Sequence, residues 1–179
     1  MEELVATILA DSKSAERESK RRQYYLQISR TLNEYLLRAK NLRDAFRYLP
    51  DLAYGNKRIA QDLSNAIAQY NQVVDSMKIN QDALVEEVSV NWQKPDLARN
   101  LREILRYALL DIHETDIIVF NEMHAKIITI VKGSIKDEQE MEAAKMNIKA
   151  TVPGRVETLN AKLVQLERNS LAFLDALKP

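Results

Sequence analysis

Residues that favour turns are scarce in this chain. It contains 3 glycines and 4 prolines among 179 residues, well below the usual share of these residues in globular domains. A sheet needs a turn between consecutive strands, so an all-β or α/β fold would need many more of them. The scarcity therefore predicts an all-α fold built from a few long helices.

The few prolines and glycines divide the chain into predicted helices within a single module, residues 1–179. Pro50, Pro95 and Pro153 each stand beside residues that favour a turn or a helix cap, and such positions commonly mark helix ends. Gly133 is the one weak point inside the third segment. We therefore expect helices at about residues 1–49, 57–93, 97–150 and 155–177.

Apolar residues in the first, second and fourth segments recur at alternating steps of three and four. In the fourth segment these steps pass through Val156, Leu159, Leu163, Leu166, Ser170, Phe173 and Leu177. An average step of about 3.5 residues is typical of helices packed side by side, knobs into holes. We expect an elongated bundle of three to four long antiparallel helices with coiled-coil-like packing.

The third segment is apolar around most of its circumference, which predicts burial on several sides. Its main stripe includes Ile104, Leu105, Ile112, Val119, Ile127 and Ile130. The helices that cover this stripe come from the same chain or from a second copy. Because exposed apolar patches of that size are rare on monomers, we expect a homodimer or a helical protein partner.

The composition disfavours several kinds of chemistry. The formal net charge is zero and there is no cysteine, so neither a nucleic-acid binder nor thiolate chemistry is favoured. No nucleophile motif or phosphate-binding loop occurs. His113, Asp116 and His124 lie near one face of the third segment, but neither histidine has the Glu-x-x-His spacing of di-iron bundles. We expect no enzymatic activity, no metal and no other cofactor.

Two basic clusters are the candidate binding residues. Arg99, Arg102 and Arg106 step by three and four, so they share a helix face near Lys94. Arginines in such a stripe can hold the phosphate groups of lipids or nucleic acids. The second cluster comprises Lys13, Arg17, Lys20, Arg21 and Arg22. The alternative is an ordinary ion-paired surface, because acidic residues lie beside both clusters.

The amino-terminal residues bear on location and docking. Leu4, Val5, Ile8 and Leu9 form a short amphipathic piece, which could lie in a membrane interface. The piece lacks a basic face and an aromatic residue, so we expect it to dock on the bundle. The chain has no apolar run of ~18 residues and no basic start typical of a signal peptide. We expect a cytoplasmic protein, with at most peripheral membrane association.

Long heptad-like helices, sharp proline breaks and a strongly apolar central helix together resemble the layout of BAR-type modules of the sorting-nexin kind. The resemblance covers most of the chain, in layout rather than in motifs. It implies a crescent-shaped homodimer that senses or bends anionic membranes, with the two basic clusters as lipid contacts. The zero net charge and the separate fourth helix depart from that pattern. The alternative is a non-enzymatic protein-interaction or toxin/effector-type bundle with no role in membrane curvature.

Overall fold

The computed structural model describes residues 2–178, with all their side chains except those of residues 2–6, 8 and 57. The elements in chain order are α1 (Glu2–Phe46), α2 (Leu49–Ala53), α3 (Lys57–Trp92), α4 (Pro95–Arg106), the π-helix η1 (Tyr107–Ile117), α5 (Ile118–Val131) and α6 (Glu138–Leu177). No strand occurs within residues 2–178, which confirms the all-α prediction.

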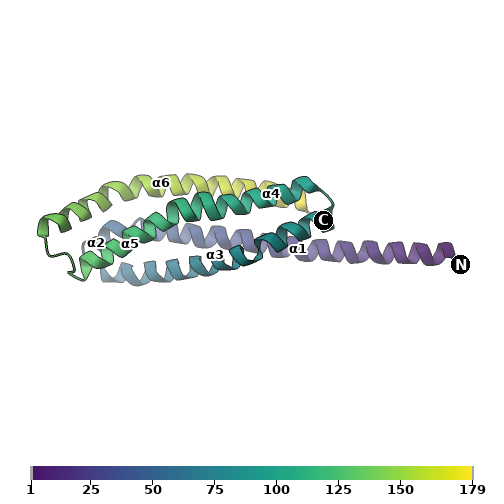
Figure 1. The fold of residues 1–179 in the computed structure, drawn as a ribbon, viewed down its shortest axis with the longest axis horizontal. Coiled ribbons are helices and arrows are strands. Elements are labelled where there is room, and N and C mark those ends of the chain that lie inside the picture. Colours follow the sequence, from purple (N-terminus) through teal and green to yellow (C-terminus); the bar gives the residue numbers. More distant parts are fainter. Residues whose placement is uncertain (1, 179) are drawn as a thin grey trace.

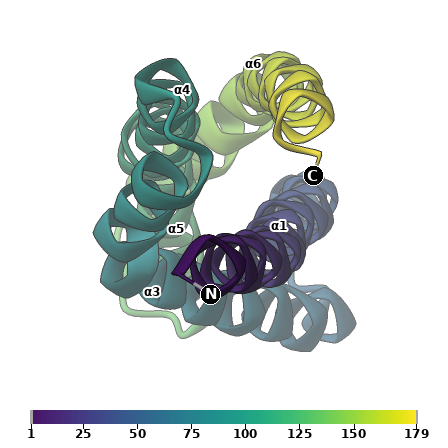
Figure 2. The same cartoon turned by 90° about the vertical axis from the view of Figure 1, so that its right-hand side faces the viewer.

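The long helices lie side by side along the long axis of the molecule (Figure 1). α1 leads from the amino-terminal end toward α2, α3 returns, and the continuous run of α4, η1 and α5 leads away again before α6 returns. Seen end-on, these four runs surround a common centre (Figure 2). At about 1.5 Å per residue, the 36 residues of α3 span roughly 54 Å, so the body is a rod.

A continuous apolar core joins all four runs within this one chain. The largest fully buried side chains include Tyr35 and Phe46 of α1, Tyr70 of α3 and Phe120 of α5. The rings of Phe46 and Phe120 stack with centroids 4.3 Å apart. Helices of the same chain therefore cover the apolar third run, and a second copy is not needed to bury it.

The first two expected helices need a small correction at their junction. α1 ends at Phe46 rather than at residue 49, and the short α2 follows before the turn. Pro50 lies in the first turn of α2, where its missing N–H costs nothing because that donor has no partner in a helix. Gly55 ends α2 with a φ of +97°, a backbone conformation that glycine adopts without strain.

The expected third helix at residues 97–150 is wrong, because the run ends at Val131. Gly133 has a φ of +69° and its N–H donates to the carbonyl of Ile130 at 3.0 Å, as is common where a helix ends at glycine. A new helix then begins after Asp137, whose side chain accepts a hydrogen bond from the N–H of Gln139 at 2.9 Å. An aspartate in this position is a favoured helix cap.

The expected break at Pro153 is also wrong, since α6 continues through it from Glu138 to Leu177. Proline cannot donate to the carbonyl four residues earlier, that of Lys149. Lys149 and Pro153 are both exposed, so water can serve that carbonyl. Ile148, Val152 and Val156 are buried on either side of the proline, and their packing holds the helix together.

Candidate functional site

The third run contains the most unusual backbone of the fold, the π-helix η1. Its buried positions step by four in two rows, which continue into α4 and α5: Leu101, Leu105, Leu109, His113 and Ile117, and beside them Ile104, Ala108, Ile112, Asp116 and Phe120. In an α-helix of 3.6 residues per turn, positions four apart drift around the helix. The wider turns of a π-helix offset that drift, so both rows stay on the inner face.

Because the buried positions of η1 lie four residues apart, part of the predicted apolar stripe needs a correction. Ile104, Leu105, Ile112, Ile127 and Ile130 are buried, as expected for core residues. Val119, placed by a seven-residue step from Ile112, is only half-buried, and the next residue, Phe120, is fully buried in its place. The heptad step fails here because η1 lengthens each turn.

A chain of hydrogen bonds crosses the core at η1. The Tyr35 hydroxyl donates to the carbonyl of Ala108 at 2.7 Å, and its oxygen lies 3.2 Å from the Tyr70 hydroxyl. The Tyr70 oxygen lies 3.3 Å from Nδ1 of His113. Each hydroxyl carries one proton, so Tyr70 donates to Tyr35 and the His113 Nδ1–H donates to Tyr70. α1, α3 and η1 are thus joined at one level.

Charged bonds extend this polar layer to the surface and to α6. Lys162 of α6 donates to Asp116 Oδ2 at 2.6 Å and to the carbonyl of Asp111 at 2.8 Å. On the other side, Lys78 of α3 lies 3.5 Å from Glu114, whose carboxylate is 4.0 Å from Nε2 of His113. η1 is therefore tied by polar bonds to all three other runs.

Burial sets the protonation states in this layer. It raises the pKa of Tyr35 well above its ordinary value, and it also raises the pKa of Tyr70. Burial and then the nearby Lys78 ammonium lower the pKa of His113 below 6.5. The three rings are therefore neutral at pH 7. Since Tyr35 and Tyr70 are almost completely buried, a dissolved substrate cannot reach them, and their hydrogen bonds join helices α1, α3 and η1 to one another.

The candidate metal ligands His113, Asp116 and His124 do not face one another. His113 faces Tyr70 and Asp116 faces Lys162, while His124 is half-buried and burial lowers its pKa. Within the part of the chain that the structure describes, no group of three or more His, Cys, Asp or Glu side chains is placed to hold a metal ion.

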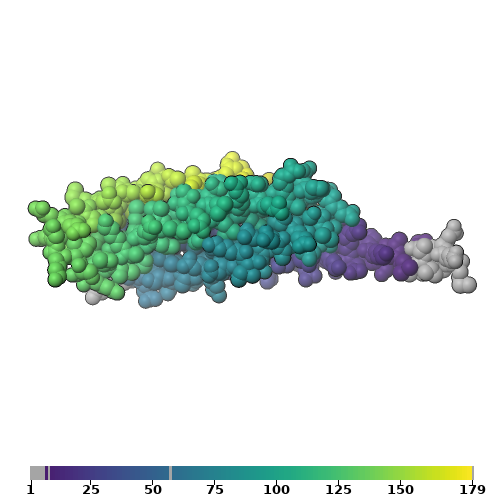
Figure 3. All heavy atoms as spheres, in the orientation of Figure 1, coloured from purple at the N-terminus to yellow at the C-terminus, as the bar shows by residue number. Residues whose placement is uncertain are grey.

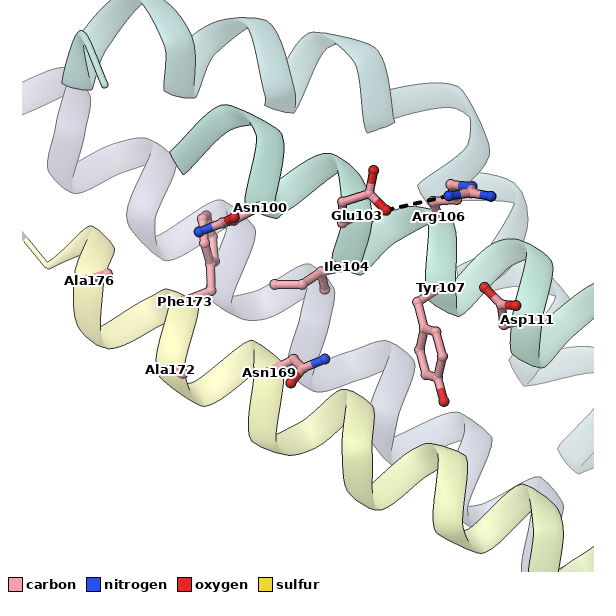
Figure 4. A pocket seen from close by; sticks show the side chains of 10 residues that line it. All are labelled: Asn100, Glu103, Ile104, Arg106, Tyr107, Asp111, Asn169, Ala172, Phe173 and Ala176. Atoms are coloured by element: carbon pink, nitrogen blue, oxygen red, sulfur yellow. Dashed lines mark hydrogen bonds and ion pairs between the residues drawn. The ribbon is translucent and has the colours of Figure 1, made fainter. Parts of the chain in front are cut away.

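An open groove with a volume of about 480 Å³ lies between α6 and the run of α4 and η1 (Figure 4). Ile104, Tyr107 and Phe173 lie between the two helices, while the ion pair of Glu103 with Arg106 stands at the edge. Polar and small residues complete the lining: Asn100, Asp111, Asn169, Ala172 and Ala176. The groove thus has an apolar floor and a polar rim.

The basic cluster of α4 is exposed but largely offset by neighbouring acids. Arg99 pairs with Asp96 at 3.1 Å and Arg106 with Glu103 at 3.5 Å. Arg99 and Arg102 also line a second groove, whose opposite wall in α3 carries Asp82 and Glu86. Lys94 is exposed at the start of α4. The predicted arginine stripe exists, but acidic residues lie along it.

The second basic cluster lies in α1, and its residues have different partners. Lys20 pairs with Glu16 at 3.1 Å and Arg22 with Glu18 at 2.6 Å. Arg21 donates from Nε to the carbonyl of Asn91 at 2.8 Å, which places the carboxyl end of α3 beside it. Lys94 follows Asn91 by three residues, so the nearest members of the two basic clusters, Arg21 and Lys94, lie at the same end of the rod.

Ahead of Arg21, α1 projects beyond the body as a single helix (Figure 3). Every described side chain from Leu9 to Lys20 is exposed, and 55% of the surface of Leu9 is accessible. We call residues 2–20 the amino-terminal arm. The expected docking of residues Leu4, Val5 and Ile8 lies outside the described side chains, but Leu9 does not dock on its own bundle.

The sequence did not reveal the contact between Tyr35 and Tyr70, although the three-and-four steps of apolar residues in the first and second predicted segments pass through these two positions. A tyrosine in a buried seam needs a partner for its hydroxyl, and the polar residues His113 and Asp116 in the otherwise apolar third segment offer one. That combination was the available signal.

No helix of the described chain is both long and apolar enough to cross a membrane. Neither a protein-family model, nor a curated protein, nor a solved structure matches the chain.

Proposed function

We propose that this protein is a non-enzymatic helical scaffold or adaptor, a cytoplasmic rod of antiparallel, coiled-coil-like helices whose docking element is the amino-terminal arm. The observation that supports this best is the exposure of every described side chain from Leu9 to Lys20 in a continuous helix. The rest of α1 buries residues such as Ile28 and Leu32 against the body.

The amino-terminal arm gains little stability from packing within its own chain. Most helical stability in proteins comes from packing of an apolar face, and residues 9–20 pack against no other helix in the described chain. The sequence nevertheless places Leu4, Val5, Ile8 and Leu9 at the tip. Contact with a partner would cover Leu9, which is 55% exposed, and stabilise the helix.

Photo-crosslinking tests this function. A photoreactive residue at Leu9 should capture a discrete partner in cells that make the protein, whereas the same residue at Val90, which is 60% exposed on the body, should not. Circular dichroism of both variants controls for folding. Equal capture at the two positions, or capture at neither, would refute the arm as the docking element.

The second candidate is the membrane-binding function that the BAR-type resemblance implies. It is favoured by Lys13, Arg17, Lys94 and Arg102, for which the described residues offer no ion-pair partner within 4.0 Å. Each such cation near an anionic surface contributes about 1 kcal/mol. In this version the protein is a crescent-shaped dimer that associates peripherally with membranes.

Co-sedimentation with phosphatidylserine vesicles at low salt tests the membrane version. The triple variant Lys13→Glu, Arg17→Glu and Lys94→Glu should lose binding, whereas Lys132→Glu should retain it, because Lys132 follows the end of α5, which lies at the opposite end of the rod from the arm (Figure 1). Binding should also weaken as salt rises, because salt screens exposed charges. Absence of wild-type binding at low salt would leave the protein-scaffold function alone.

A further inference from the structure

The arm and the groove between α4 and α6 lie at the same end of the rod. Trp92 donates from Nε1 to the carbonyl of Leu177 at 3.0 Å, so the end of α3 and the end of α6 meet there. α4 begins at Pro95 at the same end of the rod (Figure 1), and the groove lies between this run and α6 (Figure 4).

The arm cannot enter the groove of its own chain. α1 is continuous from Glu2 to Phe46 and contains neither glycine nor proline in that span, so it has no hinge at which to fold back. The arm points away from the body instead (Figure 3). Any helix that fills the groove therefore comes from another molecule.

We propose that the occupant of the groove is the arm of a second copy of this chain, and that the exchange is reciprocal about a two-fold axis. The proposal rests on the arm being the docking element. In a two-fold dimer each chain gives one arm and receives one. The two arms then run in opposite directions between the two bodies, and each tip reaches the groove of the partner.

The lengths match. The arm, residues 2–20, is about 28 Å long at roughly 1.5 Å per residue. The groove runs along α4 and η1 from Asn100 to Asp111, which corresponds to about 8 to 24 Å from the start of α4 at the same rise. An arm that begins at the end of one rod therefore spans the full groove of the next.

The chemistry matches as well. The tip sequence carries Leu4, Val5, Ile8 and Leu9, and the α6 wall of the groove presents the exposed small residues Ala172 and Ala176, which leave room for a helix above the buried Ile104 and Phe173. The groove contributes ten lining residues on each side of the interface, and the face of the arm that lies in it adds to them.

The absence of cysteine from the chain allows a clean test of contact. Chains carrying Leu9→Cys are mixed with chains carrying Ala172→Cys and oxidised. The expected product is a mixed disulfide dimer between the two kinds of chain. Leu9→Cys that links only to itself would mean that the arms pair with each other outside the groove, and that result would overturn the proposal.

Light scattering at micromolar concentrations provides the second measurement. The full chain should have twice the 20.6 kDa mass of the monomer, and both Leu9→Glu and Ala172→Arg should reduce it to the monomer mass with unchanged circular dichroism. Ile79→Glu, at a position 80% exposed on α3, should remain dimeric. A monomeric wild-type chain whose Leu9 captures another protein would overturn the second copy but leave the scaffold function standing. A monomer that captures nothing would overturn both.

Discussion

The hydrogen-bond chain through η1 yields a quantitative prediction for Tyr35→Phe. The substitution keeps the buried ring but removes the donor to the Ala108 carbonyl and the acceptor for the Tyr70 hydroxyl. One net hydrogen bond is worth about 1 kcal/mol and a buried donor left without a partner costs about 1–3 kcal/mol. We therefore expect Tyr35→Phe to lower the free energy of unfolding by about 2–4 kcal/mol. Tyr70→Phe should cost less, about 1–2 kcal/mol, because Tyr35 still donates to Ala108 and the neutral His113 can carry its proton on Nε2 instead of Nδ1.

Urea denaturation of the two single variants and the double variant measures both the costs and the coupling. Because each substitution breaks the same chain of bonds, the double variant should cost less than the sum by about 0.5–1.5 kcal/mol. Tyr48→Phe is the matched control, since Tyr48 is 53% exposed. Removal of its hydroxyl should change the free energy of unfolding by less than about 0.5 kcal/mol. Additive costs, or losses no larger than that of the control, would show that the chain of bonds does not hold the helices in register.

Three further outcomes follow from burial, titration and backbone geometry. Ile112→Ala should lower the free energy of unfolding by about 2–5 kcal/mol, whereas Val119→Ala, at a half-buried site, should cost less in the same denaturation experiment; equal losses would contradict the stride of four. Because the pKa of His113 and that of His124 are both lowered in the fold, the unfolded chain takes up protons first as pH falls through about 6.5. The free energy of unfolding should therefore keep its full value above that pH and fall as the pH drops below it. In denaturation curves measured across that range, the double variant His113→Gln with His124→Gln should show a shallower fall. Pro153→Ala should raise the thermal midpoint, since proline is up to about 3 kcal/mol less favourable than alanine inside a helix; an unchanged midpoint would mean that the helix has already adapted to the proline.

The sequence supported the fold class because the scarcity of turn residues and the apolar periodicity agree. Local signals were less reliable at individual breaks. Pro50 and Pro153 look alike in sequence, yet Pro50 begins a short helix and Pro153 lies within a long one. What separates them is tertiary packing: Ile148, Val152 and Val156 are buried at steps of four around Pro153. That packing can be known only once the neighbouring helices are placed.

For a related reason, the sequence could not predict which helices bury the apolar third run. Its apolar circumference indicated several neighbours, which was right, but one chain and two chains can supply neighbours equally well. The turn at Gly133 decides the matter, because it ends α5 and releases the following residues to return as α6. With the third run taken to continue to residue 150, the expected fourth helix, residues 155–177, was too short to cover it along its length, and a second copy was the natural source of further cover.

The polar layer required the most information that a single sequence does not hold. The hydroxyl of Tyr35 meets Tyr70 and His113 only if three helices share one register and η1 turns more widely than an α-helix. The types of residue alone still constrained the outcome: two tyrosines in apolar seams had to find partners for their hydroxyls, and His113 with Asp116 stood in the most apolar helix of the chain. Buried polar groups that lack partners are costly, so these residues had to meet one another, a carbonyl or a charge from another helix. The structure uses all three solutions at one level of the rod, through the tyrosine pair, the Ala108 carbonyl and Lys162. A slip of one residue between α1 and η1 would leave several of these groups unpaired at once, and this is why a polar layer can specify register more sharply than the apolar seams beside it.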